Sequence, residues 1–179
     1  LMTNSTAPPT DRPSAYRASP HWAAVLAAVL TLPLLYVGGS VTTYRVGMTV
    51  PDWPRTFGEN MFTYNFWEAP FGVRLEHSHR LYGSAVGLAT IALCVAFLLY
   101  DRRKWMKAMG VAALIIVIIQ GFMGGYRVTQ NSTVLAAVHG CLAQIFFALT
   151  VALATFTGRD WLSDARPTPD VKGVRVRAV

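Results

Sequence analysis

Apolar residues fall into four long blocks along the chain, separated by polar segments. The blocks span about residues 22–40, 81–100, 106–125 and 134–157. A helix needs roughly 20 apolar residues to cross the hydrocarbon core of a bilayer. The pattern therefore predicts an all-α membrane protein, in which four transmembrane helices form a bundle.

The segments between and beyond these blocks are polar, and we expect them outside the bilayer. Residues 1–20 are rich in proline and polar side chains, which predicts a disordered tail. Residues 158–179 form a charged tail. Residues 41–75 form a long outer loop, dense in the aromatic side chains that are typical of a membrane interface or of a lid over an apolar ligand. The membrane domain accordingly occupies residues 21–157.

Composition and charge exclude a water-soluble protein and orient the chain. Hydrophobic residues make up 53% of the chain and charged residues 14%, against about 25% charged in an average soluble domain. Eleven of the 16 Lys and Arg residues lie in the two tails and in the link after the second block. Because positive residues concentrate on the cytoplasmic side, both termini are expected there, with the long loop outside. The net charge of +7 is thus a topology signal, and it requires no nucleic acid.

Two glycine pairs indicate a weak internal repeat. Gly38 and Gly39 end the first block, and Gly124 and Gly125 end the third. Each pair is followed by a connection and a block with a histidine near its outer end. This plan predicts two pseudo-symmetric helical hairpins. Alternatively, the glycines serve only the close approach of membrane helices.

Two histidines lie at similar depth near the outer ends of their blocks. His79 is at the start of the second block, and His139 is about 7–8 Å into the fourth. An ionisable residue inside a membrane is a functional candidate. Two imidazoles on paired helices fit the axial positions of a haem iron, whereas zinc would need three or four ligands. The alternative is a pair of histidines hydrogen-bonded to neighbouring helices.

A carboxylate and an arginine accompany His79. Glu76 lies three residues before His79 and four before Arg80, so all three share one helix face. His77 points about 160° away from His79 and is expected to face outward. Glu76 could accept a proton or stabilise charge at a reacting ligand, or could only pair with Arg80 at a helix start. Asp52, between Pro51 and Trp53 in the loop, is expected to fix a turn.

Four stretches together resemble the haem A synthase family, the membrane enzymes that make haem A for cytochrome oxidase assembly. They are GGSVTTYRVGMTVPDWPRTFG, EHSHRLYGSAVGL, QGFMGGYRV and VLAAVHGCLAQ, within about residues 36–150. The resemblance implies that His79 and His139 are the axial ligands of haem iron. It also implies that Glu76 is the reaction-linked carboxylate and that Arg80 belongs to the cofactor-binding residues.

The resemblance further implies a reaction and its participants. A ring methyl group of haem O becomes a formyl group, with haem b or haem O in the bundle and electrons from an external donor. Many family members are about twice as long, so this chain is similar to the N-terminal four-helix half. A homodimer or a second four-helix half, a haem O synthase partner and the bacterial cytoplasmic (inner) membrane follow as expectations. The alternatives are an electron-carrying b-type cytochrome and a non-catalytic subunit that holds haem during oxidase assembly.

Overall fold

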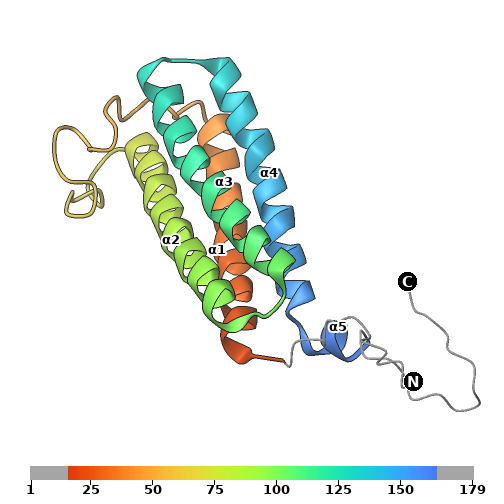
Figure 1. Cartoon of the computed structure of the whole chain (residues 1–179). Helices are drawn as coiled ribbons and strands as arrows, with labels where there is room; N and C mark the ends of the chain where they lie inside the picture. Colours follow the sequence, from red (N-terminus) through yellow and green to blue (C-terminus); the bar gives the residue numbers. More distant parts are fainter. Residues whose placement is uncertain (1–15, 165–179) are drawn as a thin grey trace, which may run out of the picture.

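The computed structural model describes residues 16–164, all of whose regular elements are helices (Figure 1). They are α1 (Ala18–Thr43), α2 (Phe71–Tyr100), α3 (Lys104–Thr129), α4 (Thr133–Phe156) and the short α5 (Arg159–Asp164). The four long helices form a bundle in which α1 packs against α2 and α4, and α3 packs against the same two helices. Consequently α2 and α4 lie diagonally opposite each other. The predicted all-α fold is confirmed.

The four long helices make this an integral membrane protein. Each is long enough to span a bilayer, and each contains an apolar window with a mean hydropathy of 2.0–2.1. Large apolar side chains cover the outside of the bundle, for example Leu88 (69% exposed) and Val29 (60% exposed). In water such a surface would be costly, whereas lipid tails solvate it without penalty.

Helix α2 begins earlier than its apolar block indicates. It starts at Phe71, inside the segment 41–75 that is predicted as loop, so the connection covers residues 44–70 only. We call residues 44–70 the outer loop. The hydropathy pattern misses the first turns of α2 because they carry charged and polar residues. These residues are nonetheless helical, and the outer loop covers several of them.

The two tails are described only in part. Helix α1 starts at Ala18, within the predicted disordered tail of residues 1–20, and α5 lies within the predicted tail of residues 158–179. Residues 1–15 and 165–179, on which the rest of these two predictions falls, lie outside the described residues.

The bundle has an apolar inner half. The outer loop and the α3–α4 link lie at one end, which we call the outer end (Figure 1). The α2–α3 turn and α5 lie at the other, which we call the inner end. Near the second end, Leu93, Phe97, Met106 and Leu153 are fully buried in one hydrophobic cluster. A Cβ atom at Gly110 would lie 3.0 Å from the Phe97 ring, so this glycine lets α2 and α3 approach closely. The outer half is therefore left for polar chemistry.

A buried ion pair closes the inner end. The Asp101 carboxylate accepts hydrogen bonds from the Arg103 backbone and guanidinium, the shortest at 2.7 Å. Arg103 Nη1 also donates to the carbonyl of Phe156 at the end of α4, at 3.0 Å. This arginine thus ties the α2–α3 turn to α4, whereas the neighbouring Arg102 is exposed.

We expect Arg103→Met to lower the thermal stability of the detergent-solubilised protein. The change leaves the Asp101 carboxylate buried without its cation, at a cost of about 1.5–3 kcal/mol for hydrogen bonds to charged groups. Arg102→Met removes the same charge from an exposed position and is the matched control. Melting temperatures from circular dichroism check this prediction, and equal melting temperatures for the two variants would contradict it.

Candidate functional site

The structure brings His79 and His139 together across the axis of the bundle. They come from the diagonal helices α2 and α4, and their ring centroids lie 6.5 Å apart. Both side chains are partly buried. The similar depth of His79 and His139 that the sequence predicts therefore agrees with their closeness in the structure. Their role as ligands stays a prediction.

Each imidazole rests against a glycine of the neighbouring helix in its own hairpin. A Cβ atom at Gly38 of α1 would lie 2.8 Å from His79 Cε1, and one at Gly124 of α3 would lie 3.3 Å from His139 Cε1. The first distance excludes any side chain unless His79 moves. The first glycine of each pair thus has the same neighbour in the two hairpins, and the pseudo-symmetry of the hairpins stays a prediction.

One nitrogen of each ring has no hydrogen bond among the described residues. Nδ1 of both His79 and His139 is buried, and no hydrogen bond within residues 16–164 uses it. The backbone carbonyls of Leu34 on α1 and Gln120 on α3 nevertheless lie close to the rings of His79 and His139, so the alternative of two histidines hydrogen-bonded to neighbouring helices stays open. The separation of 6.5 Å leaves room for one metal atom bonded to both rings at about 2 Å.

The donor set suits haem better than a fully protein-ligated metal. Residues 16–164 contain no cluster of three or more His, Cys, Asp and Glu side chains that could hold a metal ion. His79 and His139 would hold a haem iron with two imidazole nitrogens, and the porphyrin would supply the remaining ligands. The residues present therefore fit haem.

Gln120 supports His139 and is absent from the sequence-based candidates. Its Nε2 donates to the backbone carbonyl of His139 at 3.2 Å, which joins α3 to α4 beside the site. Its Oε1 is buried and has no partner among residues 16–164. An amide within an otherwise apolar membrane block is the signal that could have identified it, because such groups usually hydrogen-bond across helices.

Glu76 is buried and fully engaged. It is 1% exposed, and its Oε1 accepts a hydrogen bond from Arg80 Nη2 at 2.9 Å. Its Oε2 accepts from the Thr49 hydroxyl at 2.9 Å and from the Val50 backbone N–H at 3.0 Å. The predicted ion pair is confirmed, and the carboxylate also fixes the start of the outer loop.

Arg80 fastens the same loop to α2. Its Nη1 donates to the carbonyls of Asp52 at 2.7 Å and Arg55 at 2.9 Å. Its Nη2 donates to the carbonyl of Val50 at 2.8 Å as well as to Glu76. Because loop carbonyls satisfy most of this guanidinium, Arg80 acts on the site through the loop. Cofactor binding by Arg80 stays a prediction.

His77 points away from His79, as its helical angle predicts, but the expectation that it faces outward is wrong. It is fully buried beneath the outer loop. Its Nδ1 lies 3.1 Å from the Thr56 hydroxyl, and its ring centroid lies 4.6 Å from that of Phe66 and 5.4 Å from that of Tyr64. The helical angle gives a direction only. The loop that occupies that direction comes from elsewhere in the chain.

The outer loop also reaches α3. The Trp53 ring lies directly against Gly125, where a Cβ atom would overlap it, and packs edge-on against Phe122 at 6.0 Å between centroids. Together with the Arg80 contacts, this packing makes the loop bridge α2 and α3 at the outer end. The second glycine of the α3 pair thus accommodates the loop.

Asp52 fixes a turn in the outer loop, as predicted. Its carboxylate accepts hydrogen bonds from the backbone N–H groups of Phe57 at 2.9 Å and Gly58 at 2.8 Å, both of which have positive φ. Partial burial opposes ionisation, but these hydrogen bonds outweigh it and hold the pKa of Asp52 below its ordinary value. The loop is therefore a structured cap.

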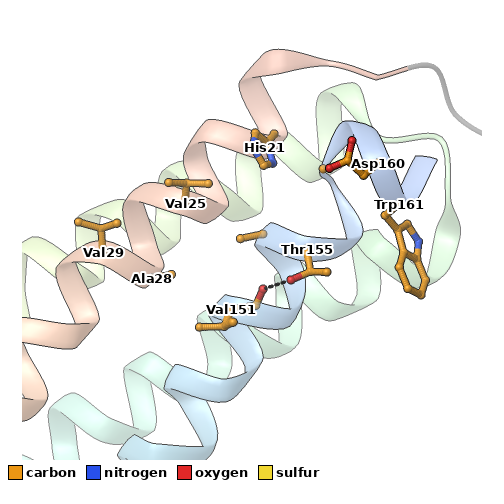
Figure 2. A pocket seen from close by; sticks show the side chains of 10 residues that line it. His21, Val25, Ala28, Val29, Val151, Thr155, Asp160 and Trp161 are labelled. Atoms are coloured by element: carbon orange, nitrogen blue, oxygen red, sulfur yellow. Dashed lines mark hydrogen bonds between the residues drawn. The ribbon is translucent and has the colours of Figure 1, made fainter. Parts of the chain in front are cut away.

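A groove at the inner end is separate from this site. It has a volume of about 530 Å³ between α1 and α4, and Figure 2 shows Val25, Val29 and Val151 along it, with His21 near α5. His21 Nδ1 lies 3.3 Å from the Thr157 hydroxyl, so it joins α1 to the end of α4. The groove offers a single imidazole and is far along the bundle from His79. We therefore place the chemistry at the outer end.

Comparison with known proteins gives consistent matches. A protein named heme A synthase from Exiguobacterium sibiricum is 33% identical over 72% of this chain and 44% of its own length. One from Rhodopseudomonas palustris is 30% identical over 94% of this chain and 53% of its own length. The chain thus spans about half the length of the curated relatives it matches. No solved structure matches.

A family pattern covers the bundle and the site together. The pattern of the cytochrome oxidase assembly proteins designated COX15-CtaA matches residues 20–179. This range includes α1 from Pro20 onward, all of α2, α3 and α4, the two site histidines and the outer loop. The chain therefore belongs to the COX15-CtaA family of cytochrome oxidase assembly proteins.

Proposed function

We propose that this chain is the substrate-haem half of a haem A synthase, which oxidises a methyl group of haem O to a formyl group for cytochrome oxidase assembly. The observation that carries the proposal is the pair of imidazoles from diagonal helices, with centroids 6.5 Å apart near the loop-covered end of the bundle and with Nδ1 atoms that make no hydrogen bond within residues 16–164. The names of the matched relatives support the same function. Because those relatives are about twice as long, the complete enzyme needs a second four-helix half or a second copy of this chain, and an electron donor.

In this proposal His79 and His139 bind the iron of haem b or haem O. The haem supplies the oxidisable ring substituent and the iron centre. The protein supplies the two nitrogen ligands and an apolar surrounding for the farnesyl tail, and the cap excludes water from the outer end. Arg80 contributes to cofactor binding by holding that cap against α2.

Glu76 is the proposed catalytic residue. It lies one helical turn before His79 on the same face of α2, so its charge is close to a ring bound there. Three hydrogen bonds fix the carboxylate, and a fixed charge stabilises positive charge that develops during oxidation without the cost of reorganisation. It could also accept the proton released in a hydroxylation step.

An electron-carrying b-type cytochrome is the second candidate. The same histidine pair would serve it. The contacts of Glu76 with Thr49, Val50 and Arg80 favour this candidate, because they give the carboxylate a complete structural role without any reaction. Glu76 is thus the residue at which the two functions differ.

We also propose that the protein resides in the bacterial cytoplasmic membrane, with both termini in the cytoplasm. The excess of Lys and Arg in the tails and the α2–α3 turn supports this orientation. It places the histidine pair and the outer loop near the outer surface.

Haem ligation is tested by spectroscopy of the purified chain. We expect a low-spin b-type spectrum, because both axial positions are filled by nitrogen. His79→Ala and His139→Ala should each abolish the low-spin bands or weaken haem retention. His21→Ala, at the inner end of the bundle, is the matched control and should leave the spectrum unchanged. Wild-type spectra in both site variants would refute the ligand assignment.

Glu76→Gln separates the enzyme from the electron carrier. Loss of one positioned acid–base group typically lowers a rate about 10²–10⁴-fold, so haem A formation should fall while the haem spectrum is retained. Thr49→Val is the control, because it removes one hydrogen bond from the same carboxylate without changing its charge. The measurement is mass analysis of extracted haems after co-expression with a haem O source and whatever second half makes the wild type active. An equal, small loss of haem A in both variants would assign Glu76 to loop support.

Topology is tested with reporter fusions. A fusion after Val179 should report a cytoplasmic location, and an insertion at the exposed Asn60 should report an external one. The physical reason is the retention of positive segments on the cytoplasmic side. The reverse pattern would place the histidine pair at the inner surface instead.

A further inference from the structure

Arg127 lies against the outer loop and within electrostatic range of the histidine pair. It lies in the last turn of α3, three residues after Gly124, and so on the helix face that contacts His139. A Cβ atom at Gly47 of the outer loop would lie 3.1 Å from Arg127 Nη2. Its charge acts electrostatically on the rings of both His79 and His139. The guanidinium is therefore at the outer edge of the proposed haem site.

This cation has no hydrogen-bonded partner in the described part of the chain. Arg127 is partly buried, and its side chain makes no hydrogen bond or ion pair with residues 16–164. The other arginines with buried guanidinium groups differ, because Arg80 pairs with Glu76 and Arg103 pairs with Asp101. The Glu76 carboxylate acts on Arg127 electrostatically, but its hydrogen bonds go to Thr49, Val50 and Arg80. A partly buried charge without a hydrogen-bonded counter-ion is costly in a membrane protein. Its position thus indicates a site for an anion that the protein itself does not supply.

A haem between the two histidines would bring such an anion. Its two propionate carboxylates lie on one edge of an otherwise apolar ring. A guanidinium binds a carboxylate through two parallel, charge-assisted hydrogen bonds, which fix orientation as well as position.

We propose that Arg127 binds a propionate carboxylate of the haem held by His79 and His139. This inference rests on the haem site proposed above. It orients the propionate edge toward the outer loop and the apolar edge toward the inner half of the bundle. Arg127 is then a specificity residue for the carboxylate-bearing edge, distinct from the iron ligands.

The test compares two forms of one haem on the purified full chain in detergent. Ferric haem b and its dimethyl ester, in which both propionates are esterified, are titrated into the wild type, Arg127→Gln, Arg127→Lys and Arg74→Gln. The exposed Arg74, on the outer end of α2, is the control for the loss of one charge. The readout is the ratio of the two dissociation constants within each protein, so that differences in the partitioning of the haems into micelles cancel between variants.

We expect the wild type and Arg74→Gln to prefer the free acid over the ester. The ratio of the ester dissociation constant to the free-acid dissociation constant should be about 10-fold to 100-fold larger in these two proteins than in Arg127→Gln. Arg127→Lys should keep part of this preference, and affinity for the ester should be similar in all four proteins. An unchanged preference in Arg127→Gln would overturn the inference while the haem site stands. Loss of both haem forms in Arg127→Gln would also overturn it, since Arg127 would then support the fold. If the wild type binds neither form with a bis-histidine spectrum, the proposed function falls together with the inference.

Discussion

The buried ion pair between Glu76 and Arg80 is the interaction on which the outer half of this molecule depends. A buried charge near the end of a membrane bundle is tolerated only with partners. Here Glu76 and Arg80 neutralise each other, and both side chains also bind the outer loop. The loop in turn covers His77 and reaches α3 through Trp53. A single helical turn of α2 therefore holds the outer loop in place beside the helix turn that carries His79.

The sequence predicts the helices well and their surroundings poorly, for a physical reason. Hydropathy follows single-residue transfer energies, so it finds the four apolar blocks and places both histidines toward the same end of the bundle. It places the start of α2 too late because it counts Glu76 and Arg80 as solvated charges, although in the structure they satisfy each other. Helical angles correctly separate His77 from His79 but do not reveal the loop that buries His77. Partners that are distant in sequence, such as Gln120 with His139, are invisible to any local pattern.

The bundle divides its volume between packing and chemistry. The inner half is filled by large apolar side chains, with Gly110 making room for Phe97. The outer half uses glycine in the same way for polar groups, because Gly38 and Gly124 make room for imidazoles. The same property of glycine, the absence of a side chain, thus gives close helix contact at one end and a polar site at the other. A rigid apolar base is what allows polar groups at the outer end to be held without a large core of their own.

The diagonal placement of the two histidines has a consequence for assembly. Each hairpin contributes one ring, α2 to the first and α4 to the second, so neither hairpin alone can hold a ligand that bonds to both. Such a ligand binds only when the hairpins are closed on each other, and by mass action its binding free energy adds to their association. The ligand then behaves as a cross-link between two halves of the chain. The affinity for this ligand and the stability of the association between the hairpins are therefore coupled. A mutation that weakens one of them also weakens the other.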